Sequence, residues 1–129
     1  MEPKGHILLV EDNEMLQEII STRLELKGFR VSIAPDGKQG VEMAIKLTPQ
    51  LILMDMSLPY MNGWEATEVI RGNEETQDVP IIALTAHALS SDRERGLAVG
   101  CNDYLTKPVD FQKLLKKIES LLVITPQET

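Results

Sequence analysis

Five short apolar runs alternate with amphipathic segments along this chain, and this alternation constrains the fold more than any other feature. The runs cover residues 6–10, 31–34, 51–54, 81–84 and 103–105. Several have no polar residue at alternate positions, which is typical of strands covered on both faces of a parallel sheet. Strict alternation of strand and helix predicts an α/β fold, in which right-handed crossovers place helices on both faces of one parallel sheet.

The segments between the runs carry apolar residues at three- and four-residue steps, as helices with one buried face do. The first helix has Asn13 as a plausible cap and Gly28 as a stop, and its stripe consists of Leu16, Ile19, Ile20 and Leu24. Shorter helices are expected around 41–45 and 64–70, and a fourth over 91–100, which begins with the capping-box sequence "SDRE". The clearest stripe covers 111–122 and follows Asp110 as a cap.

The length of 129 residues is about that of one domain with a sizeable core. We therefore expect a single domain over residues 1–129, with its core at about 5–123 and a frayed tail at 124–129. Cys101 is the only cysteine, which excludes an internal disulfide and a cysteine-based zinc site and fits a reducing compartment.

The charge and hydropathy patterns limit the classes of partner. The net charge is −7 and the pI is near 4.8, whereas a protein that neutralises nucleic-acid phosphates needs clustered Lys and Arg. No apolar run approaches the roughly 20 residues that cross a bilayer, and the N-terminus has no signal-peptide pattern. We expect a cytoplasmic protein that contacts neither nucleic acid nor membrane.

The central run leads directly into a carboxylate, Asp55, and then into a proline loop, in the sequence "LILMDMSLPYMNG". Burying an unpaired carboxylate costs several kcal/mol or forces it to take up a proton, so Asp55 needs partners unless it leaves the core as the strand ends. Ligands of open α/β sheets lie beyond the carboxyl ends of the strands, so partners are expected there. The residues just past the other runs include Glu11, Asp12, Thr85 and Lys107.

Three carboxylates, one hydroxyl and one ammonium group therefore fall on one edge of the predicted sheet. Clustered acids repel one another unless a cation joins them, and oxygen ligands beside open water positions suit Mg²⁺ or Mn²⁺. Lys107 and Thr85 are donors of the kind that surround a phosphoryl group. Asp55 can then act as a nucleophile that forms an aspartyl-phosphate.

The motifs "LLVEDNE", "LILMDMSLPYMNG", "ALTAHA" and "DYLTKP", taken together and in this order, resemble the receiver domain of two-component response regulators. The resemblance covers nearly the whole chain and is closest to stand-alone receivers of the chemotaxis-regulator type. It implies a flavodoxin-like, doubly wound fold with five parallel strands in the order 2-1-3-4-5.

The resemblance also implies roles for the acids. Asp55 would be the phosphoacceptor. Asp12, Asp55 and the backbone carbonyl of Ser57 would hold Mg²⁺, with Glu11 acting through water. Ser57 stands two residues after the acceptor, at a position where the family tunes the rate of dephosphorylation.

Further roles follow from the resemblance for residues of the last two strands. Lys107 would pair with a phosphoryl oxygen, and the Lys107–Pro108 peptide bond would be cis. Thr85 and Tyr104 would form the switch pair, in which phosphorylation draws Thr85 inward and lets Tyr104 turn from exposed to buried. His87, two residues past Thr85, would be the second tuning position.

The function implied is that of a phosphorylation-controlled binding module, not an enzyme with an external substrate. It would accept a phosphoryl group from a histidine kinase or a histidine phosphotransfer protein and catalyse only its own phosphorylation and dephosphorylation. A downstream target would read the face formed by residues 91–100, 103–105 and 111–122.

Three alternatives remain open. "LTAHA" is similar to receivers attached to hybrid histidine kinases, although Met1 and the short leader favour a free-standing form. A phosphatase of the haloacid dehalogenase type also uses an aspartate nucleophile and Mg²⁺, but it needs a second acid where Ser57 stands. A pseudo-receiver that binds without phosphorylation would not require the intact acid set.

Overall fold

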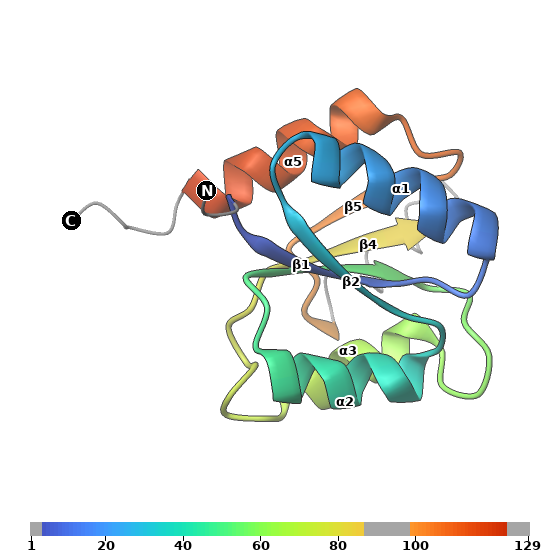
Figure 1. The fold of residues 1–129 in the computed structure, drawn as a ribbon. Helices are drawn as coiled ribbons and strands as arrows, with labels where there is room; N and C mark the ends of the chain where they lie inside the picture. Colours follow the sequence, from blue (N-terminus) through green and yellow to red (C-terminus); the bar gives the residue numbers. More distant parts are fainter. Residues whose placement is uncertain (1–3, 87–98, 124–129) are drawn as a thin grey trace.

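The computed structural model describes residues 4–86 and 99–123, and in these ranges it contains one five-stranded sheet (Figure 1). The strands are β1 (His6–Val10), β2 (Arg30–Ala34), β3 (Leu51–Asp55), β4 (Ile81–Thr85) and β5 (Asp103–Thr106). All neighbouring strands are parallel, in the order β2-β1-β3-β4-β5. The predicted fold class and strand order are confirmed.

The described helices cover both faces of the sheet. They are α1 (Glu14–Leu26), α2 (Gly37–Leu47), α3 (Gly63–Arg71) and α5 (Phe111–Val123). Figure 1 shows α1 and α5 on one face and α2 and α3 on the other. The fourth helix expected over 91–100 falls mostly outside the described residues, as does the tail at 124–129.

The core has two halves because successive residues of a strand point to opposite faces of the sheet. Ile7 and Leu9 of β1 pack in one buried cluster with residues of α1 and α5. Leu8 and Val10 pack in a second cluster with residues of α2 and α3. The middle strand is buried along its whole length, as the unbroken apolar run predicts.

Side-chain caps set the starts of the helices. Asn13 accepts a hydrogen bond from the Leu16 N–H, as the sequence predicts, and Asp110 accepts from the N–H groups that begin α5. Asp36 and Asn62 cap α2 and α3 in the same way. The apolar stripe did not indicate these two caps, because a cap lies outside the periodic part of a helix.

Three strands, β3, β4 and β5, extend one residue past the C-terminal ends of the apolar runs. β3 includes Asp55 and β4 includes Thr85, and their pairing continues as Asp55 with Leu84 and Thr85 with Thr106. Ladder hydrogen bonds are made by the backbone, so a polar side chain does not end a strand. The sheet itself therefore fixes the backbone positions of Asp55 and Thr85.

No helix within residues 4–86 and 99–123 combines the length and the apolar character that a membrane crossing needs.

Gly63 closes the loop between β3 and α3, and we expect Gly63→Ala to lower the free energy of unfolding by about 2–3 kcal/mol. A methyl group there would lie 2.4 Å from the Asp55 carbonyl oxygen and 2.7 Å from Met56 Cα, so backbone would have to move. Urea unfolding measures the change. Gly72→Ala is the matched control, because its nearest atoms lie at 3.5 and 3.6 Å and its φ is −82°. Equal stability of the two variants would contradict the steric argument.

Candidate phosphoacceptor site

Three carboxylates meet at the carboxyl edge of the sheet. Glu11 and Asp12 follow β1, and Asp55 ends the neighbouring strand β3. One oxygen atom from each residue lies within 4.8 Å of the others. Asp12 is exposed, whereas Glu11 and Asp55 are 0% and 2% exposed. Two of the acids are therefore removed from water, where a like-charge neighbour is most costly.

Lys107 supplies a positive charge among the acids. Its Nζ atom lies 3.1 Å from Asp55 Oδ2 and 3.4 Å from Glu11 Oε1. The Lys107 backbone N–H donates to the Thr85 carbonyl at 2.7 Å, which holds the residue beside the end of β4. The Lys107–Pro108 peptide bond is cis. Lys107 is 52 positions from Asp55 and 96 positions from Glu11 in the sequence. The fold thus brings residues from distant parts of the chain into contact at this site.

Proton affinities in the site are shifted from their ordinary values. Burial raises the pKa of Glu11 most, and the nearby charge of Asp55 raises it further, to about 7 from 4.5. Burial lowers the pKa of Lys107, but the hydrogen bond and the charge of Asp55, with the charge of Glu11, outweigh this and raise the pKa overall. The lysine is therefore charged near neutral pH, while Glu11 titrates there.

The donor set fits a hard divalent cation. Within the described residues, Glu11 Oε1 is buried and accepts no hydrogen bond, and the ammonium beside it lies 3.4 Å away. The Asp55 carboxylate accepts the Ser57 N–H at 3.0 Å on Oδ1, and Ser57 is itself exposed. One lysine does not neutralise three carboxylates, so the site keeps a net negative charge that a cation can offset. Carboxylate and carbonyl oxygens are the ligands that Mg²⁺ prefers.

The other predicted site residues lie near this cluster or outside the described ranges. Thr85 is buried at the end of β4, the strand next to Asp55. Tyr104 is half-buried on β5 and packs against the core cluster of the α2 and α3 face. His87 lies outside the described residues. The structure thus gathers Glu11, Asp12, Asp55 and Lys107, with Thr85 one strand away from Asp55.

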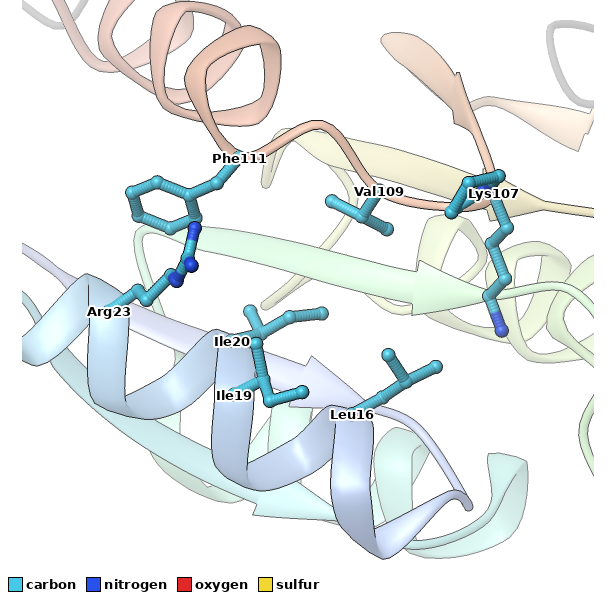
Figure 2. Close-up of a pocket in the computed structure, with 8 residues that line it drawn as sticks. Leu16, Ile19, Ile20, Arg23, Lys107, Val109 and Phe111 are labelled. Carbon is cyan, nitrogen blue, oxygen red and sulfur yellow. The ribbon is translucent and has the colours of Figure 1, made fainter.

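A groove next to the site was not indicated by the sequence. It measures about 310 Å³ and lies between α1 and the segment 107–111, with Lys107 at one end (Figure 2). Leu16, Ile19 and Val109 line it, and Ile19 is 45% exposed. Sequence reasoning placed Ile19 in a buried stripe. One sequence feature could have indicated the exposed groove. Met15 adds a further apolar residue beside the stripe, so the apolar face of α1 is wider than the face that packs on the core.

The groove continues past Phe111. The Arg23 guanidinium lies over the Phe111 ring, 5.5 Å from its centroid. Beyond this pair lies a second pocket with a more polar lining, in which Lys27 and Lys116 accompany Leu115. The groove therefore changes from apolar beside Lys107 to net basic at its far end, where Arg23, Lys27 and Lys116 outnumber Glu119.

Comparisons with known proteins give one family for the whole fold. A family model described as the response regulator receiver domain matches residues 7–119. The chain is 42% identical over 122 residues to the response regulator ArlR of Staphylococcus saprophyticus, covering 95% of this chain and 54% of ArlR. It is 34% identical over 116 residues to the polar-differentiation response regulator DivK of Brucella ovis, covering 90% of this chain and 94% of DivK.

The chain spans about half the length of the first curated relatives it matches, several of which are transcriptional regulators. Among solved structures, it is similar to the receiver domain of the sensor histidine kinase PA1611 from Pseudomonas aeruginosa, which has a magnesium ion coordinated in its active site cleft. The identity is 44% and the TM-score 0.86, over 92% of this chain and 98% of that one.

A second similar structure is the receiver domain of Ssk1 from Saccharomyces cerevisiae, in complex with the histidine phosphotransfer protein Ypd1. The identity is 35% and the TM-score 0.89, over 96% of this chain and 92% of that one. The family model covers most of the chain. The acids that follow β1 and end β3 lie together with Lys107 in the structure. The chain therefore belongs to the response regulator receiver domain family and is a receiver domain of two-component signalling.

Proposed function

We propose that this receiver domain takes a phosphoryl group from a phosphohistidine onto Asp55 and that the added charge changes the surface a downstream protein reads. One observation carries the assignment to Asp55. Its buried carboxylate ends the middle strand, contacts the Lys107 ammonium at 3.1 Å and lies beside two further acids. Intact mass after incubation with acetyl phosphate and Mg²⁺ tests it, on this chain and on Asp55→Asn.

We assign Mg²⁺ binding to Asp12, Asp55 and the backbone carbonyl of Ser57, with Glu11 acting through water. When bound, the cation offsets the charge of the acids and stabilises negative charge on the phosphoryl group. The buried Glu11 Oε1 atom, which accepts no hydrogen bond within the described residues, and the oxygen-only donor set support this assignment. Mn²⁺ prefers similar ligands and is expected to substitute.

The chemistry of the chain's own residues is simple. A carboxylate oxygen of Asp55 attacks phosphorus as the bond from phosphorus to the donor imidazole breaks, which forms an acyl phosphate. The donor ring carries a proton on its other nitrogen during the transfer, so it leaves as a neutral imidazole. The Ser57 N–H and the Lys107 ammonium hold the Asp55 carboxylate in place. Lys107 keeps its proton because its pKa is raised, so it contributes charge and orientation to the transfer.

We infer that the readout involves Thr85, Tyr104 and the face that includes β5 and α5. Phosphorylation adds acceptor oxygens beside Lys107, next to the strand end that carries Thr85. Asp103 of β5 and Lys117 of α5 form an ion pair with an Nζ–Oδ1 distance of 3.1 Å, which ties these two elements together. Tyr104 lies next to this ion pair in the sequence and lines a pocket with Lys117.

The phosphodonor is a histidine kinase or a histidine phosphotransfer protein. We infer that its body covers the groove of Figure 2, because Lys107 lines that groove and also contacts Asp55. A donor that brings its imidazole to Asp55 must cover the surface around Lys107. The apolar lining beside Lys107 fits an apolar helix face, and the basic far end fits acidic residues on that helix.

Lys107→Ala is expected to lower the stability of the metal-free protein by about 1–3 kcal/mol, because two buried carboxylates lose their cationic neighbour. Mg²⁺ is expected to raise the melting temperature of this variant more than that of the parent, since the cation then replaces the missing charge. Phosphorylation is also expected to lose its effect on affinity for the downstream partner. Thermal unfolding with and without Mg²⁺ measures the first two effects.

Lys107→Arg is the control for the charge, and it should lie between the parent and Lys107→Ala in both measurements. Equal stabilisation of all three chains by Mg²⁺ would show that Lys107 and the cation do not compensate the same acids.

A further inference from the structure

The loop between β3 and α3 is closed at its base. The Gly63 N–H donates to the Met56 carbonyl at 3.2 Å, and a methyl group on Gly63 would lie 2.4 Å from the Asp55 carbonyl oxygen. The loop of residues 57–62 therefore begins and ends at the same place, directly after Asp55. Whatever lies at the tip of this loop is held at a constant place relative to Asp55.

The tip of the loop is a strained turn with an exposed aromatic residue at its centre. The Met61 N–H donates to the Pro59 carbonyl at 2.7 Å across Tyr60, whose φ is 67°. This is a γ-turn with positive φ at its central residue, which is rare and strained for a residue with a Cβ atom and easy for glycine. The Tyr60 side chain is 93% exposed. The folded domain thus carries the strain and gains no burial from the ring.

Asp55 is only 2% exposed, so a donor must insert its phosphohistidine between the surrounding loops to reach it. A protein donor then contacts the loops that border the site, and the 57–62 loop is the one joined directly to the acceptor strand. A small donor such as acetyl phosphate reaches the same carboxylate without that contact. A contact on this loop therefore distinguishes protein donors from small ones.

We propose that Tyr60 is a specificity-determining contact for the phosphohistidine-bearing protein that phosphorylates Asp55. This inference rests on the proposed function. Tyrosine is among the residues that contribute most to protein interfaces, and the tight turn fixes the direction in which the Tyr60 Cα–Cβ bond leaves the loop. The loop leads from the sheet to α3, whereas residues of α1 and the start of α5 line the groove. Figure 1 shows α1 and α5 on the face of the sheet opposite α3. The donor would thus be held on both sides of Asp55.

The test compares two donors on the full chain. One is acetyl phosphate with Mg²⁺, and the other is whichever of a panel of purified phosphorylated histidine kinases and phosphotransfer proteins, Ypd1 included, phosphorylates the parent fastest. Tyr60→Gly is expected to slow transfer from the protein donor about tenfold or more and to leave the acetyl phosphate rate within about twofold. Its melting temperature should equal or exceed that of the parent, because glycine relieves the turn.

Two controls separate the ring from other effects. Tyr60→Phe keeps the ring and should retain most of the rate with the protein donor. Leu26→Ala removes another large exposed side chain, 80% exposed at the far end of α1, and should change neither rate. If Tyr60→Gly lowers the phosphorylation rate equally with both donors, the residue supports the structure of the loop and the proposal is overturned. An unchanged rate with both donors would overturn it as well.

The remaining outcomes are also decisive. A parent chain that accepts phosphate from acetyl phosphate but from no protein donor overturns the Tyr60 proposal and leaves Asp55 as the acceptor. A parent chain that neither acetyl phosphate nor any protein donor phosphorylates overturns the proposed function itself. Sedimentation that shows a parent dimer and a Tyr60→Gly monomer would assign the ring to contact with a second copy of this chain.

Discussion

Asp55→Asn is expected to abolish phosphorylation by acetyl phosphate and Mg²⁺, reducing the incorporated phosphate from about one group per chain to none. Asparagine has nearly the same shape as aspartate, but a neutral amide is a poor nucleophile and a weaker ligand for a hard cation. The buried position is suited to this test because the amide still meets the Ser57 N–H through its oxygen. Intact mass spectrometry, with and without acetyl phosphate, measures the effect.

Asp78→Asn is the matched control, since Asp78 is exposed and precedes β4 at the opposite edge of the sheet. It should take up phosphate at the rate of the parent. If Asp55→Asn gains phosphate as readily as Asp78→Asn, the acceptor is a different residue.

The metal-free protein is expected to lose stability as the pH rises from about 5 to 8, because Glu11 holds a proton in the folded state that it releases on unfolding. Its pKa is about 7 in the fold against an ordinary 4.5. Between these values the folded state binds more protons than the unfolded state, so the free energy of unfolding falls with rising pH. The contribution is constant below the lower value and above the higher one, and the total loss amounts to up to about 3 kcal/mol.

Glu11→Gln isolates this effect. The variant should be more stable than the parent above about pH 7, and the difference should shrink as the pH falls toward 5. Burial lowers the pKa of His6, which contributes in the opposite sense, but His6 is present in both chains and cancels in the comparison. Urea unfolding in the presence of a chelator measures both profiles. Parallel profiles would mean that Glu11 does not hold the proton.

The same titration bears on cation binding. The acids must be ionised to hold Mg²⁺, so the affinity of the parent for the cation should rise through about pH 7. Protonated Glu11 and bound cation are alternative ways to reduce the repulsion between Glu11 and Asp55, and calorimetry should detect the release of protons when Mg²⁺ binds.

Much of the fold was predictable because it depends on repeating local patterns. Unbroken apolar runs indicated strands buried on both faces, and the spacing of Leu16, Ile20 and Leu24 indicated α1. The order of the strands came from the family resemblance, and the structure has the same order. Element ends were less predictable. β3 runs on through Asp55 because the ladder is made by the backbone, and α2 begins at Gly37 because Asp36 caps it.

The membership of the site was predictable for a similar reason. Parallel strands end at one edge of their sheet, so residues that follow the apolar runs must meet there. That rule selected Glu11, Asp12, Asp55, Thr85 and Lys107. The three acids and the lysine lie together in the structure, and Thr85 ends β4, the strand next to Asp55. The direct contact between Lys107 and Glu11 was not predicted, because the rotamer of the long lysine side chain depends on the positions of all the surrounding charges.

The sequence by itself therefore determined the fold class and the set of groups at the carboxyl edge, because periodicity and chain direction are local properties that survive any detail of packing. Only the tertiary structure decided that burial raises the pKa of Glu11, that α1 and the segment 107–111 enclose a groove, and that Tyr60 occupies a strained turn with its ring in water. The burial of Glu11 and the walls of the groove depend on residues that are distant along the chain, and the torsion of Tyr60 depends on how its loop closes. None of these can be read from the pattern of neighbouring residues.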